Sequence, residues 1–512
     1  MHTLLSGMIV ISGVSISAAT PSQEPAPATT VEEGTALTVY SSADPAGFDP
    51  RRFISNQRSG RTADYVWQVP GFGVVRETRT VKLDAGISEL RFTDVAAFID
   101  PTTVGFTDLT SGTTKVLEQN FEFDLVSPEK MLAKYVDQRI SLEYRDRSWD
   151  GTLLSASGGQ VVLRSEPSGS ITILPMNNAV ISMDQLPGGL ITRPTLVWKI
   201  DSEDGGSRLV QTTYETAGLT WRADYNMVLG DGDRTADLTA WVSLMNLSGI
   251  GYENTRLKLV AGDVQRIQPA PQAMMMRDRS APATLGSRAE SFEEESFFEY
   301  HLYTLPRRTD IASNGTQQLT LFNPIRDFPV QKRLVYGPAV SNWGTPRSPR
   351  TEPNWGGGVK GKVAVYVYFE NDRKDGLGLP LPAGKVRVYK KNPNDSGIEF
   401  VGEDMIDHTP RNETVRLRLG ESFDVLGERT RTNFTVDEDA KVMTESYSIE
   451  IRNQKDVPEQ VLVVENMFRW RNWEVVKSTK RGTKVDASTM HWLLDVPAEG
   501  KRTLEYTVRY TW

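Results

Sequence analysis

Four polar side chains in the C-terminal half of the chain lie close enough in sequence to do chemistry together. Glu403, Asp404, Asp407 and His408 fall within six residues. Carboxylates beside an imidazole can hold a divalent cation or carry out general acid–base catalysis. The alternative is a loop of solvated charge between two strands, because the Thr-Pro pair that follows begins a turn. The sequence therefore offers a candidate polar site here, with a surface loop as the competing interpretation.

A second group combines aromatic rings with arginines. Phe468, Trp470 and Trp473 are interleaved with Arg469 and Arg471. Exposed rings of this kind stack on sugars or anchor a protein partner, and arginines add cation–π contacts. If the segment is a strand, the first two rings share its inner face and the arginines lie outside. We therefore expect Trp473 to be the exposed ring, with Arg471 beside it as the candidate aromatic binding pair.

Metal and cofactor chemistry has few candidate ligands in this sequence. There are four histidines and no cysteine, which excludes disulfides, thiolate zinc sites and iron–sulfur clusters. His301 and His491 lie in alternating segments, where a hydrogen-bonded strand histidine is the simpler interpretation. There is also no nucleophile elbow and no phosphate-binding glycine loop. The sequence predicts no metal and no cofactor.

The net charge of the chain argues against polyanionic partners. Fifty-eight basic and 66 acidic residues leave a net charge of −8, and no long run of one sign interrupts the chain. This argues against nucleic-acid binding and against an electrostatic membrane footprint. The missing catalytic motifs favour a binding protein over an enzyme. Any two of the 66 carboxylates can still meet in space as a hydrolase pair, so the enzyme question stays open.

The N-terminus indicates export. Residues 1–19 combine an uncharged, mostly apolar stretch with small residues at a cleavage position, which is typical of a signal peptide. Residues 20–34 are rich in Pro, Ala and Thr and predict a disordered tether. No other segment is apolar for long enough to form a membrane helix. We expect a mature chain without an integral span, in the periplasm, outside the cell or in the cell envelope of a bacterium.

Downstream, apolar residues recur with a period of two. Val81 and Leu83, then Leu90 and Phe92, place apolar side chains on one face around a short turn, which predicts a hairpin. Helical spacing is scarce, and the best example starts at Ser127 as N-cap with proline in the first helical position. The fold class is mainly β and multidomain: immunoglobulin-like β-sandwich units, a small SH3/Sm-like barrel and few short helices.

Composition changes divide this β-rich chain into units. A helix followed by five brief strands in about sixty residues predicts the small barrel, since closure removes exposed edges. The predicted units are an amino-terminal β domain (35–126), the short helix and barrel (127–190), the first part of a β-rich domain (195–264 and 297–350), a flexible linker (265–296) and a C-terminal β-sandwich (360–512).

Five ordered strings resemble a known family. They are TYETAGLTWRADYNMVL (213–229), LTAWVSLMNLSGIGYENTRLKLVAGDV (238–264), FFEYHLYTLPRRTDI (297–311), GLGLPLPAGKVRVYKK (376–391) and VGEDMIDHTPRNETVRLRLGESFDV (401–425). Together they are similar to the bacterial mucoidy inhibitor A-like family, a domain of unknown function, over about 195–512. The resemblance implies an exported, mostly β envelope protein without an assigned reaction or catalytic residues. Some members carry a coiled coil where this chain has the predicted barrel.

These observations lead to one expected function and two alternatives. We expect an exported cell-envelope β protein that acts as a non-catalytic binding or scaffold factor, with an envelope protein or polysaccharide as partner. The first alternative is an envelope hydrolase acting on polysaccharide or peptide through the acidic residues near 403–408. The second is an outer-membrane β-barrel, suggested by the alternating C-terminal run from Leu504 to Trp512.

Overall fold

The computed structural model describes most of the chain. The described residues are 32–40, 50–58, 65–123, 127–165, 168–185, 187, 190–262, 264, 292–297, 300–337, 348–354, 359–392 and 397–512. The predicted signal peptide (1–19) lies outside these ranges, as do most of the predicted tether (20–34) and most of the predicted linker (265–296).

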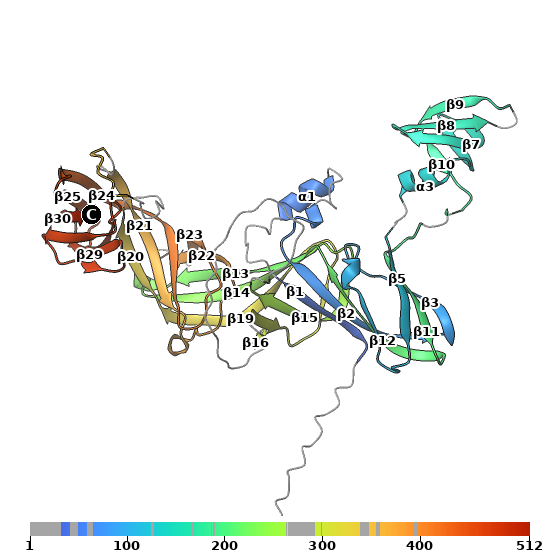
Figure 1. The fold of residues 1–512 in the computed structure, drawn as a ribbon, viewed down its shortest axis with the longest axis horizontal. Coiled ribbons are helices and arrows are strands. Elements are labelled where there is room, and N and C mark those ends of the chain that lie inside the picture. Colours follow the sequence, from blue (N-terminus) through green and yellow to red (C-terminus); the bar gives the residue numbers. More distant parts are fainter. Residues whose placement is uncertain are drawn as a thin grey trace, which may run out of the picture.

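The period-two pattern becomes five sheets, which confirms a mainly β, multidomain protein (Figure 1). Two sheets form the N-terminal side. The eight-stranded sheet runs in the order β16 (Glu293–Phe297), β17 (Tyr300–Thr304), β15 (Tyr252–Ala261), β1 (Gly34–Tyr40), β2 (Phe72–Leu83), β12 (Gly206–Thr216) and β4 (Gly105–Asp108), with β18 (Thr309–Ile311) paired to β15. The three-stranded sheet is β3 (Gly86–Thr93), β11 (Thr195–Ser202) and β5 (Lys115–Glu122).

Two further sheets carry the C-terminal half. The five-stranded sheet runs β19 (Gly315–Pro329), β14 (Thr235–Asn246), β13 (Leu219–Leu229), β22 (Gly384–Lys391) and β23 (Ile398–Ile406). The nine-stranded sheet runs β27 (Trp473–Ser478), β30 (Gly500–Thr511), β25 (Val442–Asn453), β24 (Thr414–Asp437), β21 (Val359–Glu370), β20 (Gln331–Tyr336), β26 (Glu459–Asn466), β29 (Thr489–Val496) and β28 (Thr483–Lys484).

A small lobe projects from the end of the three-stranded sheet (Figure 1). It contains α3 (Pro128–Lys134), β6 (Arg139–Tyr144), β7 (Arg147–Ser157), β8 (Gln160–Ser165), β9 (Ile171–Pro175) and β10 (Val180–Ser182). Further helical elements are α1 (Pro50–Arg58) and the 3₁₀ turns η2 (Pro101–Thr103), η3 (Asp231–Asp233) and η4 (Arg373–Asp375).

The lobe confirms the predicted helix and five strands but not their closure. The Ser127 side chain accepts a hydrogen bond from the Lys130 N–H at 3.2 Å and caps α3, as its position before proline predicts. The strands are ordered β10-β6-β7-β8-β9, and no ladder joins β9 to β10. Among the described residues this five-stranded sheet is therefore open, and it does not form the predicted closed barrel.

The predicted hairpin of residues 81–92 is wrong in its pairing. Leu83, Leu90 and Phe92 are buried, so the alternation holds. However, β2 pairs with β12 and β3 pairs with β11, so the intervening turn carries the chain from one sheet to another. Alternation fixes which face of a strand is buried, but a local pattern cannot distinguish a hairpin from a corner between two sheets.

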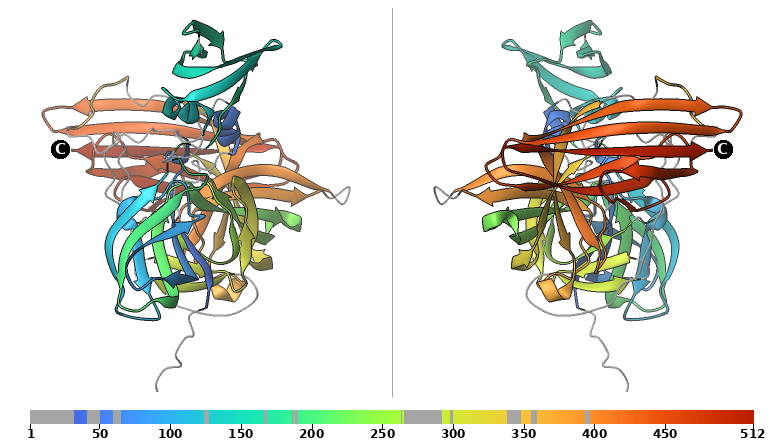
Figure 2. Two further views of the ribbon diagram at one scale, coloured as in Figure 1. Left: turned by 90° about the vertical axis from the view of Figure 1, so that its right-hand side faces the viewer. Right: turned by 90° about the vertical axis from the view of Figure 1, so that its left-hand side faces the viewer.

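Two large apolar cores share the strands β21 and β24. The central core includes Trp221, Tyr225 and Phe328, and the C-terminal core includes Tyr447, Trp492 and Tyr506. In β21, Val363 packs in the C-terminal core, whereas Val367 packs in the central core. In the same way, Leu417 of β24 belongs to the central core and Val425 to the C-terminal core. The two strands are paired antiparallel, and Figure 2 shows the long orange and red strands of the C-terminal sheet side by side. The two cores are therefore joined through continuous strands.

The C-terminal strand lies inside the nine-stranded sheet. β30 is hydrogen-bonded to β27 on one side and to β25 on the other, and its alternating residues Leu504, Tyr506, Val508 and Tyr510 are buried in the C-terminal core. Among the described residues, no helix is long and apolar enough to cross a bilayer.

A buried tyrosine lies across a pair of glycines in this sheet. Gly361 of β21 and Gly427 of β24 are directly paired. A Cβ atom added to Gly427 would lie 2.1 Å from the Tyr336 ring, and one added to Gly361 would lie 3.1 Å from it. Tyr336 itself is fully buried. The two glycines therefore provide the space that this ring fills.

The C-terminal core also contains buried charge. Arg429 and Glu465 are 3% and 1% exposed, and the Arg429 Nε lies 3.0 Å from both carboxylate oxygens of Glu465. The Tyr506 hydroxyl donates to the same carboxylate at 2.5 Å, and the guanidinium lies 3.6 Å above the Tyr447 ring. Buried charges are tolerated when they are paired and hydrogen-bonded, as they are here.

Candidate functional site

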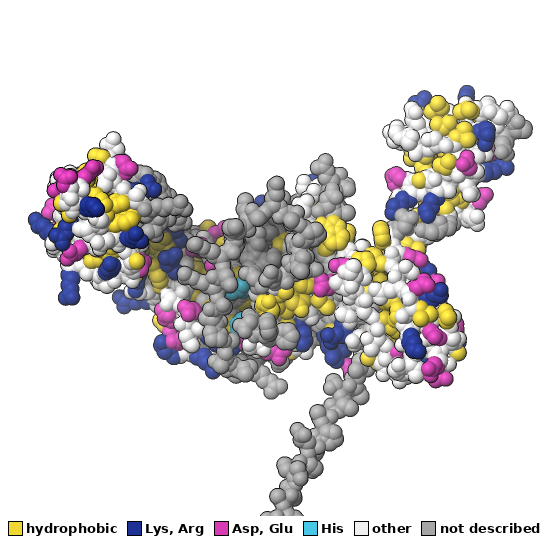
Figure 3. Space-filling model, in the orientation of Figure 1, with side chains coloured by type: hydrophobic (Ala, Val, Ile, Leu, Met, Phe, Trp, Pro, Cys, Tyr) yellow, Lys and Arg dark blue, Asp and Glu magenta, His cyan; other side chains and the backbone are white. Residues whose placement is uncertain are grey.

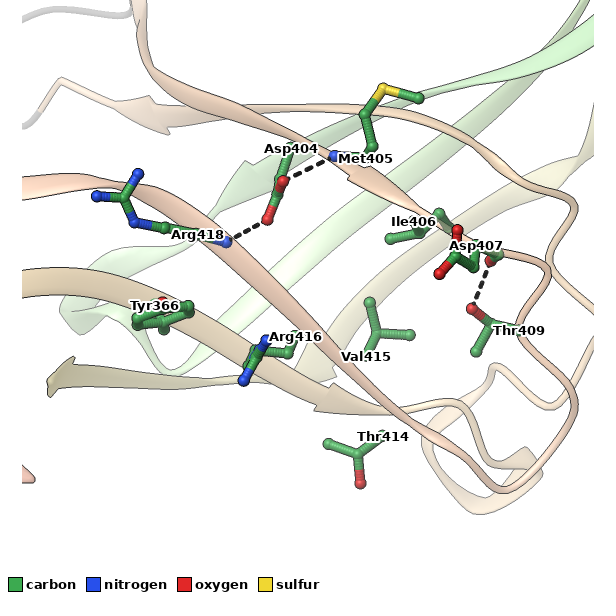
Figure 4. A pocket seen from close by; sticks show the side chains of 10 residues that line it. All are labelled: Tyr366, Asp404, Met405, Ile406, Asp407, Thr409, Thr414, Val415, Arg416 and Arg418. Carbon is green, nitrogen blue, oxygen red and sulfur yellow. Dashed lines mark hydrogen bonds between the residues drawn. The ribbon is translucent and has the colours of Figure 1, made fainter. Parts of the chain in front are cut away.

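A pocket of about 500 Å³ opens where the five-stranded and nine-stranded sheets meet (Figure 4). Its walls come from the end of β23 and the loop after it, from the start of β24, and from β21. The lining residues are Tyr366, Asp404, Met405, Ile406, Asp407, Thr409, Thr414, Val415, Arg416 and Arg418. Two of the four polar residues singled out in the sequence, Asp404 and Asp407, line this pocket.

Asp404 links the two strands that flank the pocket. Its Oδ1 accepts a hydrogen bond from the Met405 N–H at 2.9 Å, and its Oδ2 accepts one from the Arg418 N–H at 2.6 Å (Figure 4). One donor belongs to β23 and the other to β24. The carboxylate therefore takes the position that a neighbouring backbone carbonyl has in a regular ladder.

The other three residues of the predicted polar site point to different partners. Glu403 forms an ion pair with Lys385 at 3.1 Å on the neighbouring strand β22. Asp407 is an exposed residue, and its main-chain oxygen accepts a hydrogen bond from the Thr409 hydroxyl. His408 accepts at Nδ1 from the Ala383 N–H at 3.1 Å. The four residues therefore do not form one site. Glu403 is paired on a strand face, Asp404 and Asp407 line the pocket, and His408 contacts the main chain at Ala383.

The role of Asp404 can be measured by comparison with Asp407. Asp404→Asn replaces one accepting oxygen by an amide that cannot accept, so we expect a loss of about 1–2 kcal/mol in the free energy of unfolding. Asp407→Asn changes an exposed side chain and should alter stability by less than about 0.5 kcal/mol. Urea denaturation followed by tryptophan fluorescence compares the two variants. Equal stabilities would contradict the linking role of Asp404.

The cationic wall of the pocket was not found in the sequence. Arg416 and Arg418 are exposed on one face of β24, and the Arg416 guanidinium lies 5.5 Å from the centre of the Tyr366 ring. The alternation in residues 414–419, with Val415 and Leu417 buried, places both arginines on the same face. That pattern was present in the sequence, but the wall also depends on the position of β23 and on the pairing with β21, and a local pattern does not show which strands lie beside it.

The two strands come into closest contact at one glycine. A Cβ atom added to Gly402 of β23 would lie 2.3 Å from the main-chain oxygen of Leu419 in β24. Beyond this contact the two ribbons diverge towards Ile406 and Thr414 (Figure 4). A glycine is therefore needed where the strands meet, and the pocket lies where they separate.

The aromatic segment is arranged differently from its prediction. Trp473 is only 9% exposed, and its indole N–H donates to the Ala487 oxygen at 2.7 Å, so it is not the exposed ring expected. Arg469 is fully buried, while Arg471 is exposed with its guanidinium 4.7 Å from the Trp470 ring. The reason is local: residues 467–472 are not a strand, so the alternation argument does not apply to them.

His301 is a hydrogen-bonded strand histidine, as the sequence indicated. Its Nδ1 lies 2.8 Å from Oε1 of Glu294, whose other oxygen binds the Arg411 guanidinium at 2.7 Å. The carboxylate is 11% exposed. Burial acts to raise the pKa of Glu294, but the hydrogen bond and positive charge of His301, together with Arg411, outweigh it and hold the pKa below its ordinary value.

This lowered pKa predicts a pH-dependent contribution to stability. A carboxyl group with a depressed folded-state pKa stabilises the fold above its unfolded pKa, and loses that effect as pH falls through the folded value. We expect Glu294→Gln to be less stable than the parent at pH 7 and to match it at a pH below the folded pKa. Thermal unfolding across this range measures the difference. A gap that stays constant with pH would contradict the ionic role.

Across the described part of the chain, no group of three His, Asp or Glu side chains is arranged to hold a metal ion. Figure 3 shows Lys/Arg and Asp/Glu side chains intermixed over the C-terminal sheet and the small lobe. The pocket between the five-stranded and nine-stranded sheets, called the junction pocket below, offers two guanidinium groups, a phenol ring and carboxylates to a ligand.

Comparison with models of protein families gives a match over the C-terminal part of the chain. Residues 210–512 match the family model described as "Domain of unknown function (DUF4139)". The matched range contains β13 to β30 and therefore every residue of the pocket. A search of curated proteins finds no match to the chain.

Proposed function

The chain belongs to the DUF4139 family, and from this premise we propose that it is a non-catalytic binding or scaffold factor of the bacterial cell envelope, with the junction pocket as its binding site. The order of the five motif strings supports a finer placement among the mucoidy inhibitor A-like proteins. The apolar, small-residue leader supports export.

One observation carries the proposal of binding over catalysis. Both oxygens of Asp404 already accept main-chain hydrogen bonds from the two strands, so this carboxylate serves the architecture of the pocket. Arg416 and Arg418 remain exposed at the rim. Guanidinium groups beside an aromatic ring recognise carboxylates and other anions by charge-assisted hydrogen bonds. An open pocket with such a wall suits a ligand that carries acidic groups.

Photo-crosslinking in the native host tests this proposal. A photoreactive amino acid at Met405, a half-exposed pocket residue, should form adducts with an envelope macromolecule. The control position is Ile87, which is 65% exposed on β3, far from the pocket along the chain. We expect position-specific adducts in the envelope fraction for 405 and none for 87. Adducts at neither position, or equally at both, would contradict the proposal.

The hydrolase alternative has its own test. Asp407 is the pocket carboxylate whose side chain is exposed. If the protein is an envelope hydrolase, purified protein should cleave envelope polysaccharide or peptide, and Asp407→Asn should abolish cleavage while leaving the fold intact. We expect no cleavage by either form. Turnover that depends on Asp407 would replace the binding proposal by the hydrolase.

A further inference from the structure

Both strands that border the junction pocket present unpaired edges to it. Among the residues that the structure describes, β23 is the outermost strand of its sheet and pairs only with β22. β24 pairs with β21 along residues 414–421, but its pairing with β25 begins only at Val425. On the pocket side, residues 414–421 form no ladder with any described strand. Such edges carry free backbone donors and acceptors and are templates for a further strand.

The direction of these backbone groups follows from Asp404. The Arg418 N–H points across to β23, because it donates to the Asp404 carboxylate. In a strand, the N–H and C=O groups of residues i and i−2 point the same way. The backbone groups of Arg416 and Thr414 therefore point into the pocket. Asp404 occupies the narrow end, where the strands meet, and the pocket widens beyond it (Figure 4).

We propose that the junction pocket takes up an extended peptide segment of a partner protein as an added strand between β23 and β24. This inference rests on the proposed binding function and specifies its ligand class. A polysaccharide has no regular series of amide donors and carbonyl acceptors at strand spacing, so two facing strand edges favour a peptide. A segment of about four residues, roughly 13 Å when extended, suits a pocket of this size.

The side chains of the pocket also define the sequence pattern of the peptide. Arg416 and Arg418 are exposed on one face of β24, while Val415 is 3% exposed on the other. Ile406, 7% exposed, adds to the apolar lining. Because side chains of an added strand alternate between the two faces, the bound segment alternates acidic and apolar residues. Acidic side chains meet the arginines, and apolar side chains face Val415 and Ile406.

Synthetic peptides test the proposal on the full-length protein. The probe is a hexapeptide of alternating Glu and Val with blocked termini, and its affinity is measured by isothermal titration calorimetry. One control replaces Glu by Lys. A second keeps every side chain but N-methylates alternate amides, which removes the backbone donors needed for strand pairing. We expect each control peptide to bind at least tenfold more weakly than the parent peptide.

Variants of the protein separate this inference from the binding function. The double variant Arg416→Ala, Arg418→Ala should weaken peptide binding at least tenfold. Arg326→Ala, which removes an arginine with a 75% exposed side chain in β19, should leave it unchanged. Circular dichroism confirms that each variant is folded.

The outcomes are distinguishable. Equal binding of the parent and N-methylated peptides, with dependence on the two arginines retained, would overturn strand addition and leave a binding pocket. Arginine-dependent binding of an acidic polysaccharide without peptide binding would do the same. Peptide binding that is unchanged in the Arg416→Ala, Arg418→Ala variant would contradict the assignment of this pocket as the binding site. Absence of any peptide binding would overturn the inference.

Discussion

Gly427→Ala is expected to destabilise the C-terminal core by about 3 kcal/mol or more. The added Cβ would lie 2.1 Å and 2.2 Å from two atoms of the Tyr336 ring, which is fully buried. Overpacking in a closed core typically costs about 1–3 kcal/mol, and a clash with a ring that has no free space to enter falls at or above the upper end of this range. The midpoint of urea denaturation measures the loss.

Gly112→Ala is the matched control for this change. Apart from its chain neighbours, no residue has an atom within 4 Å of the position that its Cβ would take, and Gly112 is exposed. We expect a change of less than about 0.5 kcal/mol. A second variant, Tyr336→Leu combined with Gly427→Ala, should recover part of the loss because the smaller side chain vacates the space. If Gly427→Ala were as stable as the parent, the ring would not depend on the glycine pair.

Removal of one partner of the buried ion pair should have an effect of similar size. Glu465→Leu leaves the Arg429 guanidinium buried without its counter-charge and removes the acceptor of the Tyr506 hydroxyl. Loss of one member of a buried pair costs about 3–5 kcal/mol. Chemical denaturation monitored by tryptophan fluorescence is a suitable measurement, since Trp492 stacks on Tyr506 with ring centres 4.9 Å apart.

The control for the ion pair is replacement of both partners. Arg429→Met combined with Glu465→Leu removes both buried charges and keeps similar volume. Such replacements are often neutral or stabilising relative to the ion pair. We therefore expect the double variant to be markedly more stable than Glu465→Leu alone. If the double variant were the less stable of the two, the loss would come from packing rather than from the uncompensated charge.

The sequence predicted local structure well where local forces determine it. Ser127 before proline identified the N-cap of α3, and each of the five strands predicted for the lobe is present, although β7 is 11 residues long rather than brief. Capping and period-two alternation depend on neighbours a few residues apart. Pairing depends on distant segments. For that reason the strands around residues 81–92 were assigned to one hairpin, although they belong to two different sheets.

The candidate site, like the fold, could be predicted only where local sequence determines it. Asp404 and Asp407 were selected by residue type, and both line the pocket. Their chemistry could not be read from the sequence, because the partner of Asp404 is a backbone N–H on another strand. Burial of Arg469 was missed for a related reason. Its guanidinium reaches the main-chain oxygens of Arg350 and Glu352, more than a hundred residues away, and the Glu445 carboxylate.

The strand β24 has a mechanical consequence. It is 24 residues long, about 80 Å at full extension, and its two halves are anchored in different cores. Tension applied between the central and C-terminal parts is carried by β24 and β21, which both reach from one core into the other, so there is no separate linker to extend. The load falls in shear on the ladders to β21 and β25. Under tension the central and C-terminal parts therefore respond as one rigid unit and not as two domains joined by a flexible linker.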